Sequence, residues 1–269
     1  MPLWTLYGLL EGKATTGWPN ADGPDGQAGV LGMPKFDSRR CDPDCSACAE
    51  ACPTDAIVAR ADPGGRPRLE VDYGRCVVCQ LCVEACPTGA AASSFDWALG
   101  TTDRSALVFD GEPSIAKARP AAGESRKGFR RSLHIRHVDA GSCNGCESEL
   151  QALNNPFYNL HRFGIFFTPS PRFADLLLVT GPVTYAMRDP LLRTYEAMPE
   201  PRWVMAVGAC AISGGVAAGG YACANGLEGI LPVDLYLPGC PPNPAALIGA
   251  LLTFLERSPR RAAGARHAE

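Results

Sequence analysis

The stretch Gly141-Ser142-Cys143-Asn144-Gly145-Cys146-Glu147 decides how the second half of this chain is interpreted. It follows the alternating run 133–138, which predicts a β-strand. Two thiols three residues apart, with a glycine between them, therefore lie on the turn at the carboxyl end of that strand. Taken alone, such a C-x-x-C motif is compatible with zinc, a redox disulfide or an iron–sulfur cluster.

Two later apolar runs end in the same way. Residues 202–207 are followed by Gly208-Ala209-Cys210, and residues 233–237 by Pro238-Gly239-Cys240. Because ligands gather beyond the carboxyl ends of the strands in an open α/β sheet, we expect these turns to converge. Four thiolates are the usual complement of a [4Fe–4S] cluster, although a four-cysteine zinc site has the same count. The predicted ligands are Cys143, Cys146, Cys210 and Cys240.

Strand-like and helix-like patterns alternate between these turns. We expect strands at 133–138, 164–168, 175–180, 202–207 and 233–237, helices at 147–154, 184–198 and 244–256, and a glycine-rich loop at 208–220. Alternating strands and helices with buried apolar strands predict a mostly parallel sheet between two helical layers. The expected fold of this half is a flavodoxin-like three-layer α/β domain.

Composition and charge exclude several classes of protein. The chain has 269 residues, of which 46% are hydrophobic, and a net charge of −3, so no nucleic-acid partner is indicated. No apolar run reaches the length of a membrane span, and no secretory signal is visible. We therefore expect a cytoplasmic location. In that reducing compartment, 13 cysteines indicate metal rather than disulfides.

Two dense cysteine runs occupy the first half of the chain. The second run, which ends in Pro87, has the full C-x2-C-x2-C-x3-C-P spacing of two-cluster bacterial ferredoxins. In that arrangement three cysteines of a run hold one cluster and the fourth holds the other, so we expect a ferredoxin-like α+β domain. Zinc ribbons do not normally place four cysteines this close together. The predicted ligand sets are Cys41, Cys45, Cys48 and Cys86 for the first cluster, and Cys76, Cys79, Cys82 and Cys52 for the second.

The first run departs from the ferredoxin spacing, because three residues separate Cys41 from Cys45. We favour Cys41 as a ligand. The alternative is a three-iron or oxygen-labile cluster, with Asp42 or Asp44 as a weak substitute. The thirteenth cysteine, Cys223, belongs to none of the three sets and is expected to be a small buried or partly exposed thiol.

These patterns divide the chain into four parts. We expect a two-cluster domain with an N-terminal extension at 1–110, a polar and basic linker at 111–131, a second cluster domain at 132–257 and a disordered tail at 258–269. Within the extension, residues 1–12 predict a short apolar helix that needs a covering surface.

Four linked motifs in the second domain resemble the small subunit of group 4 [NiFe] hydrogenases. They contain Cys143 and Cys146, residues 179–183, residues 208–215 and residues 237–244. The resemblance is to the formate hydrogenlyase and hydrogenase-4 type, which is similar to the cluster-bearing quinone-module subunit of respiratory complex I. Residues 1 to about 110 resemble the two-cluster ferredoxin subunit of the same complexes. The chain thus resembles a fusion of two adjacent subunits.

The resemblance implies an electron-transfer subunit of an oxidoreductase complex. Three [4Fe–4S] clusters would relay electrons between an outer electron donor or acceptor and the nickel–iron site of a separate hydrogenase large subunit. This chain lacks the pair of C-x-x-C motifs, one near each end of the chain, with which that large subunit binds nickel. The implied partners also include membrane subunits, through which the chain would be peripherally attached to the membrane.

Three interpretations of the function stay open, of which the hydrogenase type is the first. Complex I-type relatives use two adjacent cysteines where this chain has Cys143 and Cys146, so the separated pair favours the hydrogenase type. The second interpretation is the same relay in a nickel-free, complex I-like assembly, with a complex I-like homologue of the large subunit as partner. A third is a free-standing electron carrier or a zinc-stabilised interaction module.

Several polar side chains lie close to the third cysteine set. Glu147 and Glu149 are candidates for a proton relay near a partner's metal site, although carboxylates in the first turn of a helix also interact favourably with its dipole. His134 and His137 are three positions apart on one strand, so we expect them on opposite faces.

Overall fold

The computed structural model describes residues 3–61, 67–110, 128–257, 262–263 and 266–267. Most of the predicted linker 111–131 and of the predicted disordered tail 258–269 lies outside these residues, as does the turn between β2 (Ile57–Ala61) and β3 (Pro67–Asp72). Within the tail, β11 (Ala262–Ala263) pairs with β12 (Arg266–His267) in antiparallel fashion. The described helices include none with both the length and the apolar character of a membrane span.

One five-stranded sheet forms the centre of the second half. Neighbouring strands are all parallel, in the order β7-β6-β8-β9-β10. In chain order this is 2-1-3-4-5, the flavodoxin-like arrangement, so the predicted α/β fold is confirmed. The strands are β6 (Leu133–Asp139), β7 (Ile165–Phe167), β8 (Leu176–Thr180), β9 (Trp203–Val207) and β10 (Leu235–Leu237).

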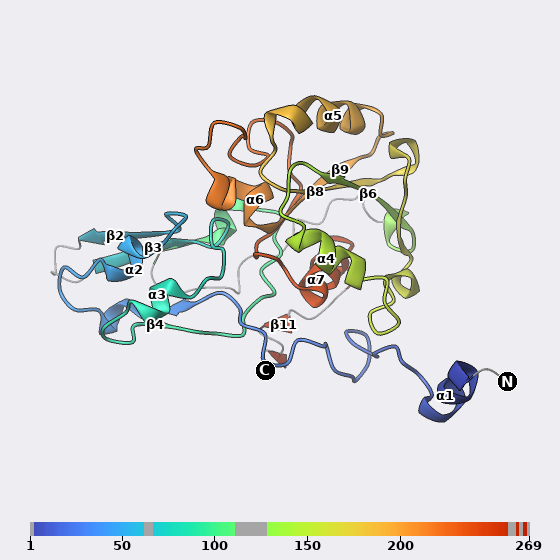
Figure 1. Cartoon of the computed structure of the whole chain (residues 1–269), viewed down its shortest axis with the longest axis horizontal. Helices are drawn as coiled ribbons and strands as arrows, with labels where there is room; N and C mark the ends of the chain where they lie inside the picture. Colours follow the sequence, from blue (N-terminus) through green and yellow to red (C-terminus); the bar gives the residue numbers. More distant parts are fainter. Residues whose placement is uncertain (1–2, 62–66, 111–127, 258–261, 264–265, 268–269) are drawn as a thin grey trace.

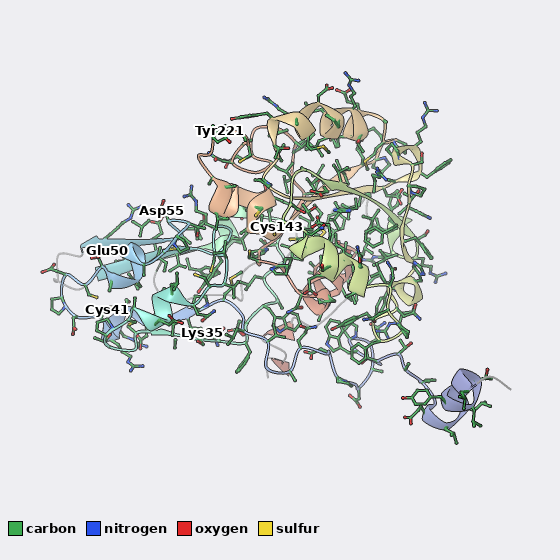
Figure 2. The ribbon with its side chains drawn as sticks, viewed as in Figure 1. Lys35, Cys41, Glu50, Asp55, Cys143 and Tyr221 are labelled. Carbon is green, nitrogen blue, oxygen red and sulfur yellow. The ribbon has the colours of Figure 1, made fainter. Side chains whose placement is uncertain are left out.

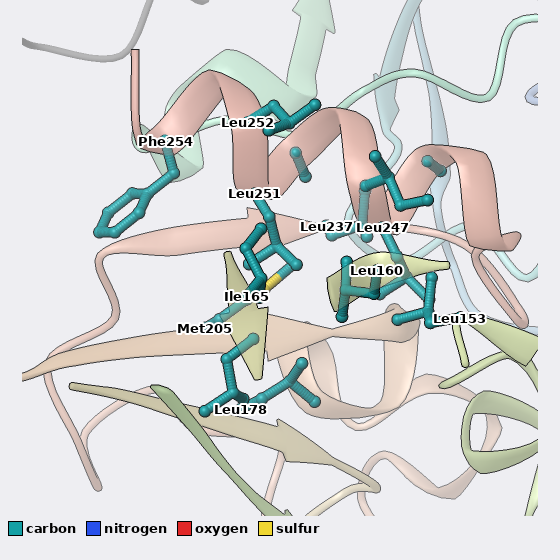
Figure 3. Close-up of a cluster of buried hydrophobic side chains, with 14 of the residues drawn as sticks. Leu153, Leu160, Ile165, Leu178, Met205, Leu237, Leu247, Leu251, Leu252 and Phe254 are labelled. Atoms are coloured by element: carbon teal, nitrogen blue, oxygen red, sulfur yellow. The ribbon is translucent and has the colours of Figure 1, made fainter. Parts of the chain in front are cut away.

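Helices cover both faces of this sheet, with α5 and α6 on one side and α4 and α7 on the other (Figure 1). Successive strand residues face opposite ways, so Leu176 and Leu178 join the core under α7, whereas Leu177 and Val179 join the other core. Figure 3 shows the first of these cores, where α7 packs on the sheet. The four helices are α4 (Gly145–Ala152), α5 (Tyr185–Glu196), α6 (Gly208–Ser213) and α7 (Pro244–Phe254).

The expectation of a loop over the whole of 208–220 was wrong for its first six residues, which form α6. Gly208 has a φ of +85° and Gly214 a φ of +88°, so the two glycines bound the helix instead of interrupting it. The left-handed conformation at Gly208 turns the chain sharply out of β9, and Gly214 ends the helix. A short 3-10 helix, Gly215–Ala217, follows.

The ferredoxin half repeats one small unit. Two four-residue helices, α2 (Ala47–Glu50) and α3 (Leu81–Glu84), follow corresponding cysteines of the two runs. Strands β2, β3 and β5 (Val108–Asp110) form an antiparallel sheet, and β1 (Lys35–Phe36) pairs with β4 (Ala91–Ala92). Buried residues of these strands, among them Phe36, Ile57 and Val71, belong to the same hydrophobic cluster as the α5–α6 face of the α/β domain. The two halves therefore share a core.

Segments of the first 110 residues also lie directly on the α/β domain. Arg162 donates hydrogen bonds to the carbonyl oxygens of Thr16 and Trp18, and Gln27 donates to the hydroxyl of Tyr158 at 2.5 Å. Trp18 is buried in the α7 core. In contrast, α1 (Leu3–Glu11) lies away from the body of the protein in Figure 1, with leucines up to 86% exposed.

The part of the chain that the structure describes contains four further 3-10 helices. They are η1 (Ser38–Arg40), η2 (Arg104–Leu107), η5 (Leu160–Phe163) and η6 (Pro171–Phe173).

Candidate iron–sulfur sites

We name the three cysteine sets by their predicted clusters. Site 1 is Cys41, Cys45, Cys48 and Cys86; site 2 is Cys52, Cys76, Cys79 and Cys82; site 3 is Cys143, Cys146, Cys210 and Cys240. All twelve are free thiols in the structure. In Figure 2, Cys41 of site 1 lies in the ferredoxin half, well separated from Cys143 of site 3 beside α4.

The four thiols of site 2 line a single pocket. Cys52 reaches it from the end of the first run, whereas the other three belong to the loop of the second run. The remaining walls are mostly apolar, with Phe36, Ile57 and Val71 among them. This is the crossed arrangement predicted from the spacing, and the cavity has the cysteine donors that a cluster requires.

In site 2, burial and the proximity of other thiols raise the pKa values of two of the cysteines. Burial raises the pKa of Cys76 to about 11 and that of Cys82 to about 12. The thiolates of Cys52 and Cys79 raise both pKa values further. A site that gathers buried thiolates without a compensating charge is unfavourable, so this donor set suits a cationic iron core.

Site 1 is assembled in the same crossed way, with Cys86 beside the first run. Burial raises the pKa of Cys48 to about 11, and the thiolates of Cys41, Cys86 and Cys45 add to the rise. Burial also raises the pKa of Cys41, followed by the charges of Cys45 and Cys86. The structure therefore brings Cys41 together with the other three thiols despite the longer spacing before Cys45.

The backbone of the two loops explains how the longer spacing is tolerated. Asp44 and Val78, which immediately precede the second cysteine of each run, both have a φ of 57°. Such a left-handed conformation is unusual for a β-branched residue and is held only by its surroundings. Since the two loops match at this point, the extra residue is absorbed between Cys41 and Asp44.

The two crossing cysteines are held by backbone donors. The amide of Ala56 donates to Sγ of Cys52 and the amide of Ala91 to Sγ of Cys86, both at 3.3 Å. Burial would raise the pKa of Cys86, but the Ala91 amide and other donors hold this pKa below its usual value. Amide donors stabilise a thiolate, which is the form that binds iron.

Site 3 lies where the turns after β6, β9 and β10 meet. An added Cβ at Gly208 would lie 2.9 Å from Sγ of Cys146 and 3.4 Å from the carbonyl oxygen of Gly239. The amide of Ala209 donates to that same carbonyl at 2.9 Å. Glycine at 208 therefore lets the first turn of α6, which contains Cys210, lie close to the turn of Cys146 and to the turn of Cys240. This convergence is what the positions of the cysteines predicted.

The thiols of site 3 influence one another as those of the other sites do. Burial raises the pKa of Cys210 to about 11, and the thiolates of Cys240 and Cys143 raise it further. Burial raises the pKa of Cys240 as well, followed by the charges of Cys143 and of Cys79. Because Cys79 belongs to site 2, sites 2 and 3 are electrostatic neighbours.

A single zinc ion fits these sets poorly. Zinc binds thiolates at about 2.3 Å in a tetrahedron, which places the sulfurs about 3.8 Å apart. Within the described ranges, no group of three or more His, Cys, Asp or Glu side chains could hold a lone metal ion. Four free thiols in each set are instead the usual ligand complement of a [4Fe–4S] cluster.

Glu147 and Glu149 have different surroundings. Glu147 is 9% exposed, and its carboxylate accepts hydrogen bonds from Ser142 Oγ at 2.6 Å and from the hydroxyl of the fully buried Thr180. His137 Nε2 lies 3.0 Å from Thr180 Oγ1. Glu149 is half-buried, and burial raises its pKa. Only Glu147 is part of a hydrogen-bonded network beside Cys146.

Sequence reasoning missed the two hydroxyls that hold Glu147. One signal was present: Thr180 is the polar end of the otherwise apolar strand β8, directly before the turn at Gly181. Cys223 is 7% exposed, as a buried thiol should be, and its Sγ donates to the carbonyl oxygen of Ala217 at 3.2 Å.

Comparison with known proteins matches both halves. The family described as "NADH ubiquinone oxidoreductase, 20 Kd subunit" matches residues 143–254, and a 4Fe-4S dicluster domain matches residues 40–90. An uncharacterized protein of Methanocaldococcus jannaschii is 46% identical over 123 residues, which are 46% of this chain and 82% of that protein.

Two further matches have names that refer to complexes. Formate hydrogenlyase subunit 7 of Escherichia coli (strain K12) is 48% identical over 122 residues, 45% of this chain and 48% of that protein, so the chain spans about half the length of this relative. A chain of the membrane-bound sulfane sulfur reductase, an archaeal respiratory membrane complex, aligns with a TM-score of 0.44 at 37% identity, covering 49% of this chain and 73% of that chain.

The chain belongs to the family of the NADH ubiquinone oxidoreductase 20 Kd subunit, with a 4Fe-4S dicluster domain preceding the family domain. The resemblance drawn from the cysteine motifs is thereby confirmed, and so is the expectation of iron–sulfur clusters in the first half.

Proposed function

We propose that this chain is the electron-transfer subunit of a multisubunit, membrane-associated complex of the group 4 [NiFe] hydrogenase type. Three [4Fe–4S] clusters, held by sites 1, 2 and 3, would relay electrons between an outer redox partner and a nickel–iron site in a separate large subunit. The observation that carries the proposal is the gathering of all twelve motif cysteines into three sets of four.

The neighbouring sites suggest the order of the relay. Cys79 of site 2 and Cys240 of site 3 lie close enough for the charge of one to raise the pKa of the other. Cys82 of site 2 is in turn influenced by Cys48 of site 1. The proposed path is therefore linear, from site 3 through site 2 to site 1, where the outer electron donor or acceptor would bind.

Site 3 is the proposed neighbour of the large subunit. Its thiols at Cys143 and Cys240 are exposed, so a partner can approach this cluster closely. Glu147, held by Ser142 and Thr180, is the carboxylate of this chain best placed to relay protons toward that partner. Attachment to the membrane would come through other subunits of the complex.

One alternative retains the same relay without nickel. The family name refers to NADH ubiquinone oxidoreductase, so a complex I-like assembly with a nickel-free partner is the second candidate. The separated pair Cys143 and Cys146 and the 48% identity with formate hydrogenlyase subunit 7 favour the hydrogenase type.

The two candidates are separated by purifying the native complex under nitrogen, then assaying nickel and hydrogen-dependent dye reduction on the same sample. Nickel together with hydrogen-dependent reduction would support the hydrogenase type. A complex that contains iron but neither nickel nor hydrogen activity would point to the complex I-like type.

A further inference from the structure

A ring of contacts joins the loop of site 2 to the turns of site 3. Asp72 ends β3, four residues before Cys76, and it is bound by Arg104 through two hydrogen bonds of 2.8 and 2.6 Å. The Asp72 side chain is 18% exposed and that of Arg104 is 30% exposed. A bidentate contact between a guanidinium and a carboxylate fixes their relative orientation as well as their distance.

The ring continues from Asp72 into the α/β domain. Asp72 accepts from the amide of Gly74 at 2.9 Å. The Ser213 hydroxyl is shared between two carbonyl oxygens, that of Gly74 at 3.1 Å and that of Ala209 in its own helix at 3.0 Å. Ser213 is the last residue of α6, one turn beyond Cys210. At the other end of α6, the Ala209 amide donates to the carbonyl of Gly239, next to Cys240.

The ring closes through β10. Thr101 and Tyr236 exchange two backbone hydrogen bonds, of 2.9 and 2.7 Å, and Thr101 is 2% exposed. Thr101 lies three residues before Arg104, and Tyr236 lies four residues before Cys240. We call Asp72, Gly74, Thr101, Arg104, Ser213 and Tyr236 the junction ring.

Local packing at Gly74 allows the Arg104 side chain to approach the backbone of this turn closely. A Cβ at Gly74 would lie 2.8 Å from Cζ of Arg104. Glycine at this position lets the guanidinium lie against the turn while it binds Asp72, whereas a larger residue would make the Arg104 side chain shift. Arg60 and Glu70 form an exposed ion pair on the same sheet, 2.8 Å apart, and the Arg60 side chain is 63% exposed. Among the described residues, no hydrogen bond or ion pair links this pair to the α/β domain.

We propose that the junction ring sets the spacing and orientation between the clusters of sites 2 and 3, with Arg104 and Ser213 as its positioning residues. The inference rests on the proposed relay, because it assigns these residues to the step between two of its clusters. Neither residue touches a cluster ligand in any described contact; each acts through the loop or helix that carries one. Electron tunnelling depends steeply on distance, so a loosened ring slows this step while both clusters stay bound.

The test uses the native complex carrying Arg104→Gln, Ser213→Ala or the matched control Arg60→Gln, all prepared under nitrogen. Iron per chain is measured first. The magnetic interaction between the reduced clusters of sites 2 and 3 is then measured by electron paramagnetic resonance, and the electron-transfer rate between them by rapid freezing. The conservative variant is Arg104→Lys, which keeps the positive charge but cannot form the bidentate contact with Asp72.

We expect unchanged iron in all variants. Arg104→Gln and Ser213→Ala should weaken the magnetic interaction and slow the transfer, Arg104→Lys should restore part of both, and Arg60→Gln should match the unmodified complex. Unchanged interaction and rate in Arg104→Gln and Ser213→Ala would overturn the inference. So would loss of iron in both, because the residues would then hold the clusters instead of spacing them. No cluster at site 3 in the unmodified complex would instead refute the proposed relay.

Discussion

Gly208 is the position where a single methyl group tests the geometry of site 3. Its φ of +85° is in the left-handed region, which costs an L-residue about 1–2 kcal/mol. In addition, the new Cβ of Gly208→Ala would lie 2.9 Å from Sγ of Cys146, closer than these atoms can approach. Cys146 must therefore move, and it is a predicted ligand.

We expect Gly208→Ala to lower the free energy of unfolding by about 1–2 kcal/mol. For a protein of this size that corresponds to a decrease in Tm of about 2–8 °C. The larger effect should be chemical: the cluster of site 3 is lost or displaced, while those of sites 1 and 2 remain. Iron per chain should fall from about twelve toward about eight, as expected for loss of one four-iron cluster out of three.

The matched control is Gly249→Ala. Gly249 lies inside α7, and a Cβ there would meet nothing within 4 Å. Replacement of a helical glycine by alanine should raise stability by about 0.5–1 kcal/mol. The assays are iron analysis, electron paramagnetic resonance and thermal unfolding of both variants under nitrogen. If Gly208→Ala keeps all its iron and the stability of the unmodified protein, the convergence described for site 3 is not the reason for glycine at this position.

Three further predictions concern other parts of the chain. Cys41→Ser should convert or empty the cluster of site 1, whereas Cys223→Ser should leave iron per chain unchanged; equal iron in both variants would remove Cys41 from the ligand set. Burial lowers the pKa of His137, so the unfolded chain binds its proton more readily and stability should fall as the pH drops below about 6.5, the usual histidine pKa. His137→Gln should flatten this part of the pH profile of Tm, and an identical profile would contradict the assignment. Leu153→Ala removes a fully buried side chain and should cost about 2–5 kcal/mol of unfolding free energy, whereas Leu10→Ala at an exposed position of α1 should cost almost none by the same denaturant titration.

Cysteine spacing carried most of what could be predicted from the sequence. The runs around Cys48 and Cys82 predicted two crossed ligand sets, and strand-end placement predicted that Cys146 would meet Cys210. The structure brings these cysteines near one another because short spacings constrain the backbone locally and because parallel strands end at one edge of a sheet; their role as cluster ligands stays a prediction. The parallel α/β fold followed from the alternation of apolar strands and helices.

Contacts between distant segments could not be predicted in this way. The hydrogen bond from Ser213 to Gly74 joins residues 139 positions apart, and neither residue type indicates the other. The helix α6 was missed because its glycines were counted as loop residues, although their left-handed conformations start and end the helix. Burial of Trp18 against the α/β domain likewise depends on partners far along the chain.

The most direct test of the central claim is a redox titration of the native complex, prepared under nitrogen and followed by electron paramagnetic resonance together with iron analysis. The account predicts three [4Fe–4S] signals from this chain, about twelve irons, and magnetic interaction along the order site 3, site 2, site 1. Two clusters with zinc at site 3, or three clusters without interaction between sites 2 and 3, would contradict it.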